Sequence, residues 1–112
     1  MKTSELTGKA LDWAVLKAQG QNFTDFNLKY MDAYPFSTDW SQGGPIIERE
    51  GIEFKKGNPL YFLQGNEQGN YYEPLWISGK QHGPTPLIAA MRCFVASKLG
   101  DEVDIPEGLE SV

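Results

Sequence analysis

One stretch decides the fold of this chain: residues 83–100, with the sequence GPTPLIAAMRCFVASKLG. It carries the signals for both ends of one helix, because Thr85 is a good N-cap, Pro86 suits the first helical position, and Gly100 can end a helix in the left-handed conformation. Between these residues nearly every side chain is apolar. A helix that is apolar nearly all round is a buried one. We therefore expect a sheet on one side of it, and a second helix or a second subunit on the other.

The rest of the chain predicts shorter elements. Thr7 and Gly20 mark a first helix over 7–20, and proline followed by a final glycine marks a short helix over 45–51. Alternating apolar and polar residues predict strands at 26–30, 52–55 and 103–105. Two largely apolar runs, at 60–63 and 71–77, predict further short strands, and Pro74 gives the second an edge position or a bulge. Residues 32–44 have no period, and residues 107–112 have the pattern of a frayed tail. The sequence thus predicts a single α+β domain over 1–112, with a small, mainly antiparallel sheet packed against two main helices and one short helix.

Composition excludes several classes of function. The net charge of −5 argues against non-specific nucleic-acid binding, which needs a Lys/Arg footprint, but it leaves room for a small anionic ligand in a local pocket. No apolar run approaches the ~20 residues of a membrane span, and the N-terminus has no signal-peptide core, so we expect a cytoplasmic protein without membrane contact. One cysteine and one histidine leave no disulfide and no zinc cluster. We expect no metal and no cofactor, and we expect Cys93 to be buried and inert.

Residues 37–44 are the best local candidate for a ligand site. They place hydroxyls, a carboxylate, an amide, an indole ring and glycine backbone within a short loop: Ser37, Thr38, Asp39, Trp40, Gln42, Gly43 and Gly44. An aromatic plane with flanking hydrogen-bond groups suits a nucleobase or another planar ligand. The alternative is structural, an Asx-type turn with Trp40 filling the core, and the residues favour it slightly.

Two predicted helix starts, at 43–45 and 83–86, follow glycine and could bind phosphate through backbone N–H groups. Proline removes N–H groups from both, and two glutamates add negative charge near the first. The second start is the better candidate because His82 and Thr85 could add donors. Simple capping remains the favoured interpretation of both.

Arg92 is the one cation in the middle of the apolar helix. It needs a partner, because an unpaired buried charge is costly. That partner is either an anionic ligand or a carboxylate, such as that of Asp39, and the carboxylate is the safer prediction. We find no nucleophile, base and orienting group in a recognisable arrangement. The residues therefore predict no catalytic group and favour a binding protein over an enzyme.

Three stretches together resemble a known family: LTGKALDWAV at 6–15, STDWSQGGPIIEREGI at 37–52 and GPTPLIAAMRCFVASKLGDEV at 83–103. They are similar to the NinX-like proteins of lambdoid phages and prophages, a family whose domain has no assigned function. The resemblance spans nearly the whole chain except residues 57–75. It implies a small phage accessory protein that acts in the bacterial cytoplasm, and it carries over no catalytic residue. Analogy with other small phage proteins adds a role against host defence.

Three hypotheses follow. In the first, the protein is a non-enzymatic homo-oligomer that sequesters a small, nucleotide-like ligand between its subunits. In the second, it inhibits or adapts a host protein through its acidic and aromatic surface. In the third and weakest, it hydrolyses a nucleotide signal.

Overall fold

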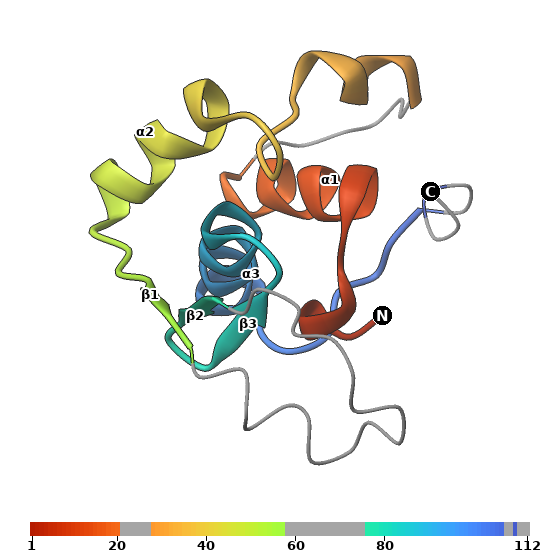
Figure 1. Ribbon diagram of the computed structural model, residues 1–112. Coiled ribbons are helices and arrows are strands. Elements are labelled where there is room, and N and C mark those ends of the chain that lie inside the picture. Colours follow the sequence, from red (N-terminus) through yellow and green to blue (C-terminus); the bar gives the residue numbers. More distant parts are fainter. Residues whose placement is uncertain (21–27, 58–75, 107–108, 110–112) are drawn as a thin grey trace, which may run out of the picture.

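Helix α3 (Pro86–Leu99) is the central element of the fold. The computed structural model describes residues 1–20, 28–57, 76–106 and 109, and Figure 1 looks nearly along the axis of α3. The start of the helix follows the predicted signals, and Gly100 ends it as predicted, but with a φ of +87° and a ψ of −165° instead of the left-handed helical conformation expected. The Ile88 N–H donates to Thr85 Oγ1 at 3.1 Å, and Pro86 occupies the first turn. Such signals can be identified from sequence because each acts within one turn of the chain.

The other elements surround α3. The sheet packs along it on one side, and α1 (Gly8–Ala18) and α2 (Trp40–Glu50) pack on the others (Figure 1). The predicted combination of sheet and second helix is therefore confirmed, as is the α+β class. The apolar surface of α3 is largely covered within one chain, so it does not require a second subunit. Its buried residues are Leu87, Ala89, Ala90, Met91, Arg92, Phe94 and Val95.

Helix α2 begins earlier than the sequence predicted. The expected start at Pro45 is wrong, because Asp39 caps the helix and Pro45 lies inside it. Proline cannot donate to the carbonyl oxygen one turn back, but that oxygen belongs to Ser41, whose exposure leaves water as a partner. Gly51 ends α2 in the left-handed conformation, with a φ of +63°, as predicted.

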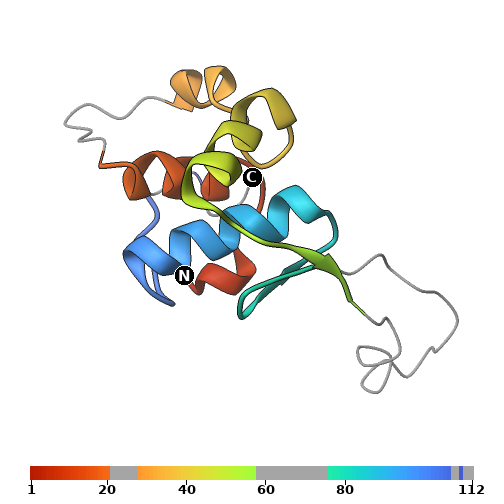
Figure 2. The same cartoon turned by 90° about the vertical axis from the view of Figure 1, so that its left-hand side faces the viewer.

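Helix α2 runs alongside α3 in the same direction (Figure 2). Gly43 lies against Leu87 near the start of both helices, and Lys98 Nζ lies 3.6 Å from Glu50 Oε1 near their ends. The N-terminal ends of the two helices are consequently neighbours, and so are their C-terminal ends.

The described sheet has three short antiparallel strands in the order β1-β2-β3: β1 (Lys55–Lys56), β2 (Trp76–Ser78) and β3 (Gln81–Gly83). A tight turn through Gly79, which has a φ of +58°, joins β2 to β3. We did not predict β3, although a glycine between two short polar and apolar runs is a signal for such a hairpin.

Strand register assigns the side chains to two faces. Trp76 pairs with Lys56 on one side and Gly83 on the other, and these residues share the face that packs on α3. A Cβ at Gly83 would lie 2.8 Å from the backbone nitrogen of Ala89, so the hairpin approaches α3 closely at this glycine. Ile77, paired with Lys55 and His82, lies on the opposite face.

Several strand predictions are wrong within the described residues. The second half of the predicted strand 26–30 belongs to the 3-10 helix η2 (Leu28–Ala33), and residues 26–27 lie outside the described part. Residues 52–54 precede β1 without joining it, and 103–105 form no strand. In the segment 32–44, expected to be irregular, residues 32–33 belong to η2 and residues 40–44 to α2, while 34–39 lie in neither a helix nor a strand. Short alternating runs do not fix a strand, because pairing partners decide the outcome. The predicted strand 60–63 and residues 71–75 lie outside the described residues.

The first residues of the chain pair with the segment after α3. Before α1 lies the short helix η1 (Thr3–Glu5), whose Thr3 donates its N–H to Asp101 O at 2.8 Å and its hydroxyl to Gly100 O at 2.7 Å. The Val103 N–H donates to Met1 O at 2.9 Å, and the backbones of Lys2 and Glu102 form an isolated antiparallel β-bridge. Leu109 is fully buried in the core, and the other residues of the expected frayed tail, 107–108 and 110–112, lie outside the described residues. None of the described helices is long and apolar enough to span a membrane.

Candidate functional site

The start of α2 is fixed by Asp39. Its Oδ1 accepts hydrogen bonds from the Ser41 N–H at 2.9 Å and the Ser41 hydroxyl at 2.7 Å. These bonds hold the pKa of the exposed Asp39 carboxyl below its ordinary value. The predicted Asx-type turn is therefore present, and its carboxylate already occupies the N-terminal end of the helix.

Trp40 does not fill the core. Its side chain is 49% exposed, and its ring centroid lies 5.9 Å from that of Phe54, which is itself 37% exposed. Phe54 in turn meets the ring of Trp76 edge-on, with 6.2 Å between centroids. We call Trp40, Phe54 and Trp76 the aromatic cluster. The structural alternative for Trp40 is thus wrong, and the cluster presents ring surface to solvent.

The aromatic cluster lies beside the N-terminal ends of both α2 and α3. Trp40 is the first residue of α2, and Trp76 pairs with Gly83, just before the start of α3. Lys56 pairs with Trp76 and shares its face of the sheet, so it brings a positive charge to the edge of the cluster. Helix N-termini and a lysine favour an anionic group nearby, whereas Asp39 opposes one.

The structure separates the predicted site residues into exposed and buried groups. Thr38, Asp39 and Trp40 are exposed around the start of α2, Gln42 and Gly44 are half-buried there, and Thr85 is exposed at the start of α3. Ser37 and Gly43 are buried: Ser37 is only 1% exposed, and Gly43 lies against Phe36 and Leu87. His82 lies on the sheet face opposite Trp76. The loop and Thr85 are thus brought to neighbouring helix starts, while the side chain of His82 is directed elsewhere.

Ser37 has a structural partner that the sequence did not reveal. Its N–H donates to Oδ1 of Asp12, a buried residue of α1, at 2.8 Å. Burial raises the pKa of the Asp12 carboxyl above its ordinary value, although the hydrogen bonds from Ser37 act in the opposite direction. The sequence signal for this contact is an aspartate among the apolar residues of α1. Its hydrogen bond with Ser37 connects α1 to the loop before α2.

Arg92 is paired with backbone carbonyls instead of a carboxylate. Its Nε–H donates to Leu6 O at 2.8 Å and its Nη1 to His82 O at 2.7 Å, and the residue is 8% exposed. Burial lowers the pKa of the guanidinium. The expected pairing with Asp39, or with a glutamate in the described part of the chain, is wrong. Arg92 instead connects α3 to Leu6, the residue after η1, and to β3, which makes it a structural cation.

No group of three or more His, Cys, Asp or Glu side chains within the described ranges is arranged to hold a metal ion. What the described residues offer near the helix starts is ring surface, backbone N–H groups and hydroxyls. This arrangement suits recognition of a planar ligand by stacking.

Comparison with known proteins places the chain in a family. A protein-family model described as "Bacteriophage P22, NinX" matches residues 2–98, a range that includes all three helices and the sheet apart from the last residue of α3. A search of curated proteins finds no similar sequence. Because the match covers most of the chain, this protein belongs to the NinX family of bacteriophage P22.

Proposed function

We propose that this NinX-family protein binds and sequesters a small nucleotide-like ligand at the aromatic cluster, without altering it chemically. The observation that carries the proposal is the half-exposed ring of Trp40 in contact with Phe54. Burying a large apolar side chain stabilises a fold by about 1.5–3 kcal/mol, and Trp40 forgoes much of that stabilisation. A planar ligand ring stacked on Trp40 would bury this exposed ring, and that burial would then stabilise the complex.

Charge around the cluster supports an anionic ligand of modest size. A phosphate group is attracted by the N-terminal ends of α2 and α3 and by the ammonium group of Lys56. The negative charge of Asp39 weakens this attraction. In the bacterial cytoplasm, where we place the protein, such a ligand would include nucleotide-derived signals of host defence. Withdrawing one of them would serve an infecting phage.

The expected homo-oligomer stays a prediction. Since α3 is covered within one chain, binding between subunits has to rest on some other surface, and we propose the ligand site without it. Solution size, measured by light scattering, determines the oligomeric state.

A second candidate is docking of a host protein on the same region. It is favoured by Tyr34, an exposed aromatic residue outside the cluster, whose ring stacks on that of Phe36 with 6.0 Å between ring centroids. Exposed aromatic side chains are enriched at protein interfaces. Hydrolysis of a nucleotide signal remains the weakest of the three.

The test is a titration with a defined panel: AMP, GMP, cyclic mononucleotides and cyclic dinucleotides. Ligand at 100 times its Kd stabilises the fold by about 2.7 kcal/mol, which raises Tm on the order of 10 °C for a domain of this size. Trp40→Ala and Phe54→Ala should abolish the shift. Tyr34→Ala, which removes an exposed ring outside the cluster, is the matched control and should keep it.

The three hypotheses predict different outcomes after incubation with extract of infected cells. A sequestering protein releases unaltered nucleotide on heat denaturation, as judged by mass spectrometry, and a hydrolase releases a product of changed mass. A docking protein instead retains a host protein in pull-downs, and loses it in Tyr34→Ala. If no nucleotide of the panel raises Tm, ligand sequestration is refuted.

A further inference from the structure

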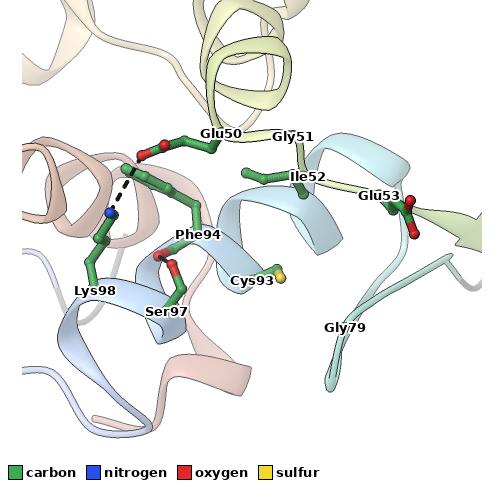
Figure 3. A pocket seen from close by; sticks show the side chains of 9 residues that line it. All are labelled: Glu50, Gly51, Ile52, Glu53, Gly79, Cys93, Phe94, Ser97 and Lys98. Atoms are coloured by element: carbon green, nitrogen blue, oxygen red, sulfur yellow. Dashed lines mark hydrogen bonds and ion pairs between the residues drawn. The ribbon is translucent and has the colours of Figure 1, made fainter.

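A groove with a cavity volume of about 410 Å³ lies at the C-terminal ends of α2 and α3 (Figure 3). Its side chains are already engaged in the fold: Phe94 is a core residue, 2% exposed, and Glu50 Oε1 lies 3.6 Å from Lys98 Nζ. Cys93, which is half-buried instead of fully buried as expected, lines the groove next to Gly79. These residues select no ligand. The aromatic cluster lies at the opposite ends of the two helices.

Trp40 lacks the side chains that normally cover a residue in the first turn of a helix. A helical side chain lies over the turn that precedes it, so a residue is covered by those three and four positions later. For Trp40 these positions are Gly43 and Gly44, and neither has a side chain. The indole ring, which is 49% exposed, is consequently open along the side of α2.

The two glycines differ in what a side chain would meet. A Cβ at Gly43 would overlap the backbone oxygen of Phe36 and lie 2.6 Å from Leu87 Cδ1, so the packing of α2 on α3 requires this glycine. At Gly44 the nearest atom to a Cβ is Trp40 Cε3, at 3.9 Å, and the φ of Gly44 is not positive. Tertiary packing therefore leaves room at position 44, and the first group that a side chain there would meet is the Trp40 ring.

Phe54 borders the Trp40 ring without stacking on it in parallel. The two ring planes are inclined by 52°, with 5.9 Å between their centroids. On the helix side, Gly44 lies four residues after Trp40, about 6 Å further along the helix axis, and is half-buried. The indole and the bare backbone at Gly44 together form a continuous surface that is longer than the indole alone.

From these observations we propose that Gly44 determines which base the aromatic cluster accepts, and that this base is a purine. One ring of the purine stacks on Trp40, and the other lies over the backbone of Gly44. A pyrimidine is covered by the indole alone, so it gains no contact from the missing side chain. The inference rests on the proposed function, whose ligand it narrows from a nucleotide-like molecule to a purine nucleotide.

Substitutions at position 44 test the inference. Gly44→Ala should bind AMP about as tightly as the unmodified chain, because a Cβ 3.9 Å from Trp40 Cε3 is in ordinary contact with the ring. Gly44→Leu should weaken AMP binding at least about tenfold and CMP binding less, since its side chain occupies the place of the second ring. Isothermal titration calorimetry measures the Kd values.

Gly44→Gln provides a second long side chain and should give the same result, and glutamine is a good helix former. All three variants place a Cβ before Pro45, so comparison with Gly44→Ala isolates the effect of the atoms beyond Cβ. Tm is measured for every variant, which separates a loss of binding from a loss of the fold.

Arg49→Leu is the matched control. Arg49 is exposed and lies nine positions after Trp40, which places it on the opposite side of α2. At about 0.15 M NaCl, where distant charges are largely screened, this variant should keep the Kd for AMP within about twofold.

A measurement without ligand checks the geometry. Acrylamide quenching of tryptophan fluorescence reports mainly on Trp40, since Trp13 is buried and Trp76 is half-buried, and Trp40→Phe gives the share of those two residues. Quenching should decrease in Gly44→Leu and Gly44→Gln and stay unchanged in Arg49→Leu.

Unchanged quenching in both long variants would overturn the inference, and so would an AMP-to-CMP preference equal to that of Gly44→Ala. In either case, AMP binding by the unmodified chain would still support the proposed function. If the unmodified chain binds neither AMP nor CMP while quenching decreases as expected, the proposed function is wrong, and purine selection is refuted with it.

Discussion

The Nη1 atom of Arg92 lies 2.7 Å from the carbonyl oxygen of His82 and donates a hydrogen bond to it. The same guanidinium reaches Leu6 O from its Nε–H at 2.8 Å. One side chain of the central helix thus satisfies backbone groups of two separate segments. A buried cation used in this way stabilises the connections of the fold and is not available to a ligand.

Replacing Arg92 by methionine tests that role. Arg92→Met keeps the length of the side chain and leaves two carbonyl oxygens without their donor, so we expect a loss of about 2–3 kcal/mol in the free energy of unfolding. Urea denaturation followed by circular dichroism measures it. Arg49→Met, at an exposed arginine of α2, should change that free energy by less than about 0.5 kcal/mol. Equal effects of the two substitutions would contradict a structural role of Arg92.

Alanine substitutions at the neighbouring Gly43 and Gly44 should change the stability of the fold in opposite directions. A Cβ at Gly43 would overlap the backbone oxygen of Phe36 and lie 2.6 Å from Leu87 Cδ1, so Gly43→Ala should destabilise the fold by about 1–3 kcal/mol. At Gly44 the nearest atom is Trp40 Cε3 at 3.9 Å, and Gly44→Ala should raise stability by about 0.5–1 kcal/mol, because alanine favours helix. Thermal denaturation of the two variants side by side checks both signs. Similar Tm values would rule out the close packing of α2 on α3.

Asp12 predicts a specific dependence of stability on pH. Its pKa is raised above the ordinary value of 3.8 by burial, so the folded chain holds the proton more tightly than the unfolded chain does. The contribution of Asp12 to stability therefore increases as the pH falls through the folded-state pKa toward 3.8, and at neutral pH its charge is a cost.

Asp12→Asn removes this titration while an oxygen remains to accept the Ser37 N–H. Relative to the variant, the unmodified chain should gain stability as the pH is lowered from 7 toward about 4.5, as measured by urea midpoints at several pH values. Asp104→Asn, at an exposed aspartate, should follow the unmodified chain throughout. A constant difference between Asp12→Asn and the unmodified chain would contradict the raised pKa.

Asp39 connects stability with the proposed ligand. Asparagine caps helices about as well as aspartate, so Asp39→Asn should leave Tm nearly unchanged. It removes a negative charge next to Trp40, and the affinity for AMP should rise about twofold to fivefold. Fluorescence titration at low salt is the measurement, and the gain should diminish as salt is added. If Asp39→Asn instead bound AMP more weakly, the phosphate group would not lie near Asp39.

The sequence predicted those features that depend on neighbouring residues. The ends of α3 follow from Thr85, Pro86 and Gly100, all of which act within a turn of the chain, and its burial follows from its apolar composition. The start of α2 was misplaced because proline and glycine also mark helix starts, whereas here the cap at Asp39 determines it and the helix begins at Trp40, five positions before Pro45. In that competition a side-chain cap outweighed the penalty of an internal proline.

Long-range partners could not be predicted. One partner of Arg92 is the carbonyl oxygen of Leu6, 86 residues away, and nothing in the sequence marks one backbone oxygen among many. The exposure of Trp40 was equally uncertain, since an indole at a helix start can point either way. The pocket near Cys93 arises only when the end of α2 meets the second half of α3.

The pairing of Thr3 with Gly100 and Asp101 bears on how the chain is made. At ribosomal rates of about 5–20 residues per second, the partners of Thr3 are synthesised roughly 5–20 s after it. Helix α1 packs on α3 and must wait for it as well, with Leu11 and Val15 lacking their final neighbours in the meantime. The nascent N-terminal half is therefore a natural client for chaperones, and the fold closes only after Gly100 and Asp101 have been synthesised.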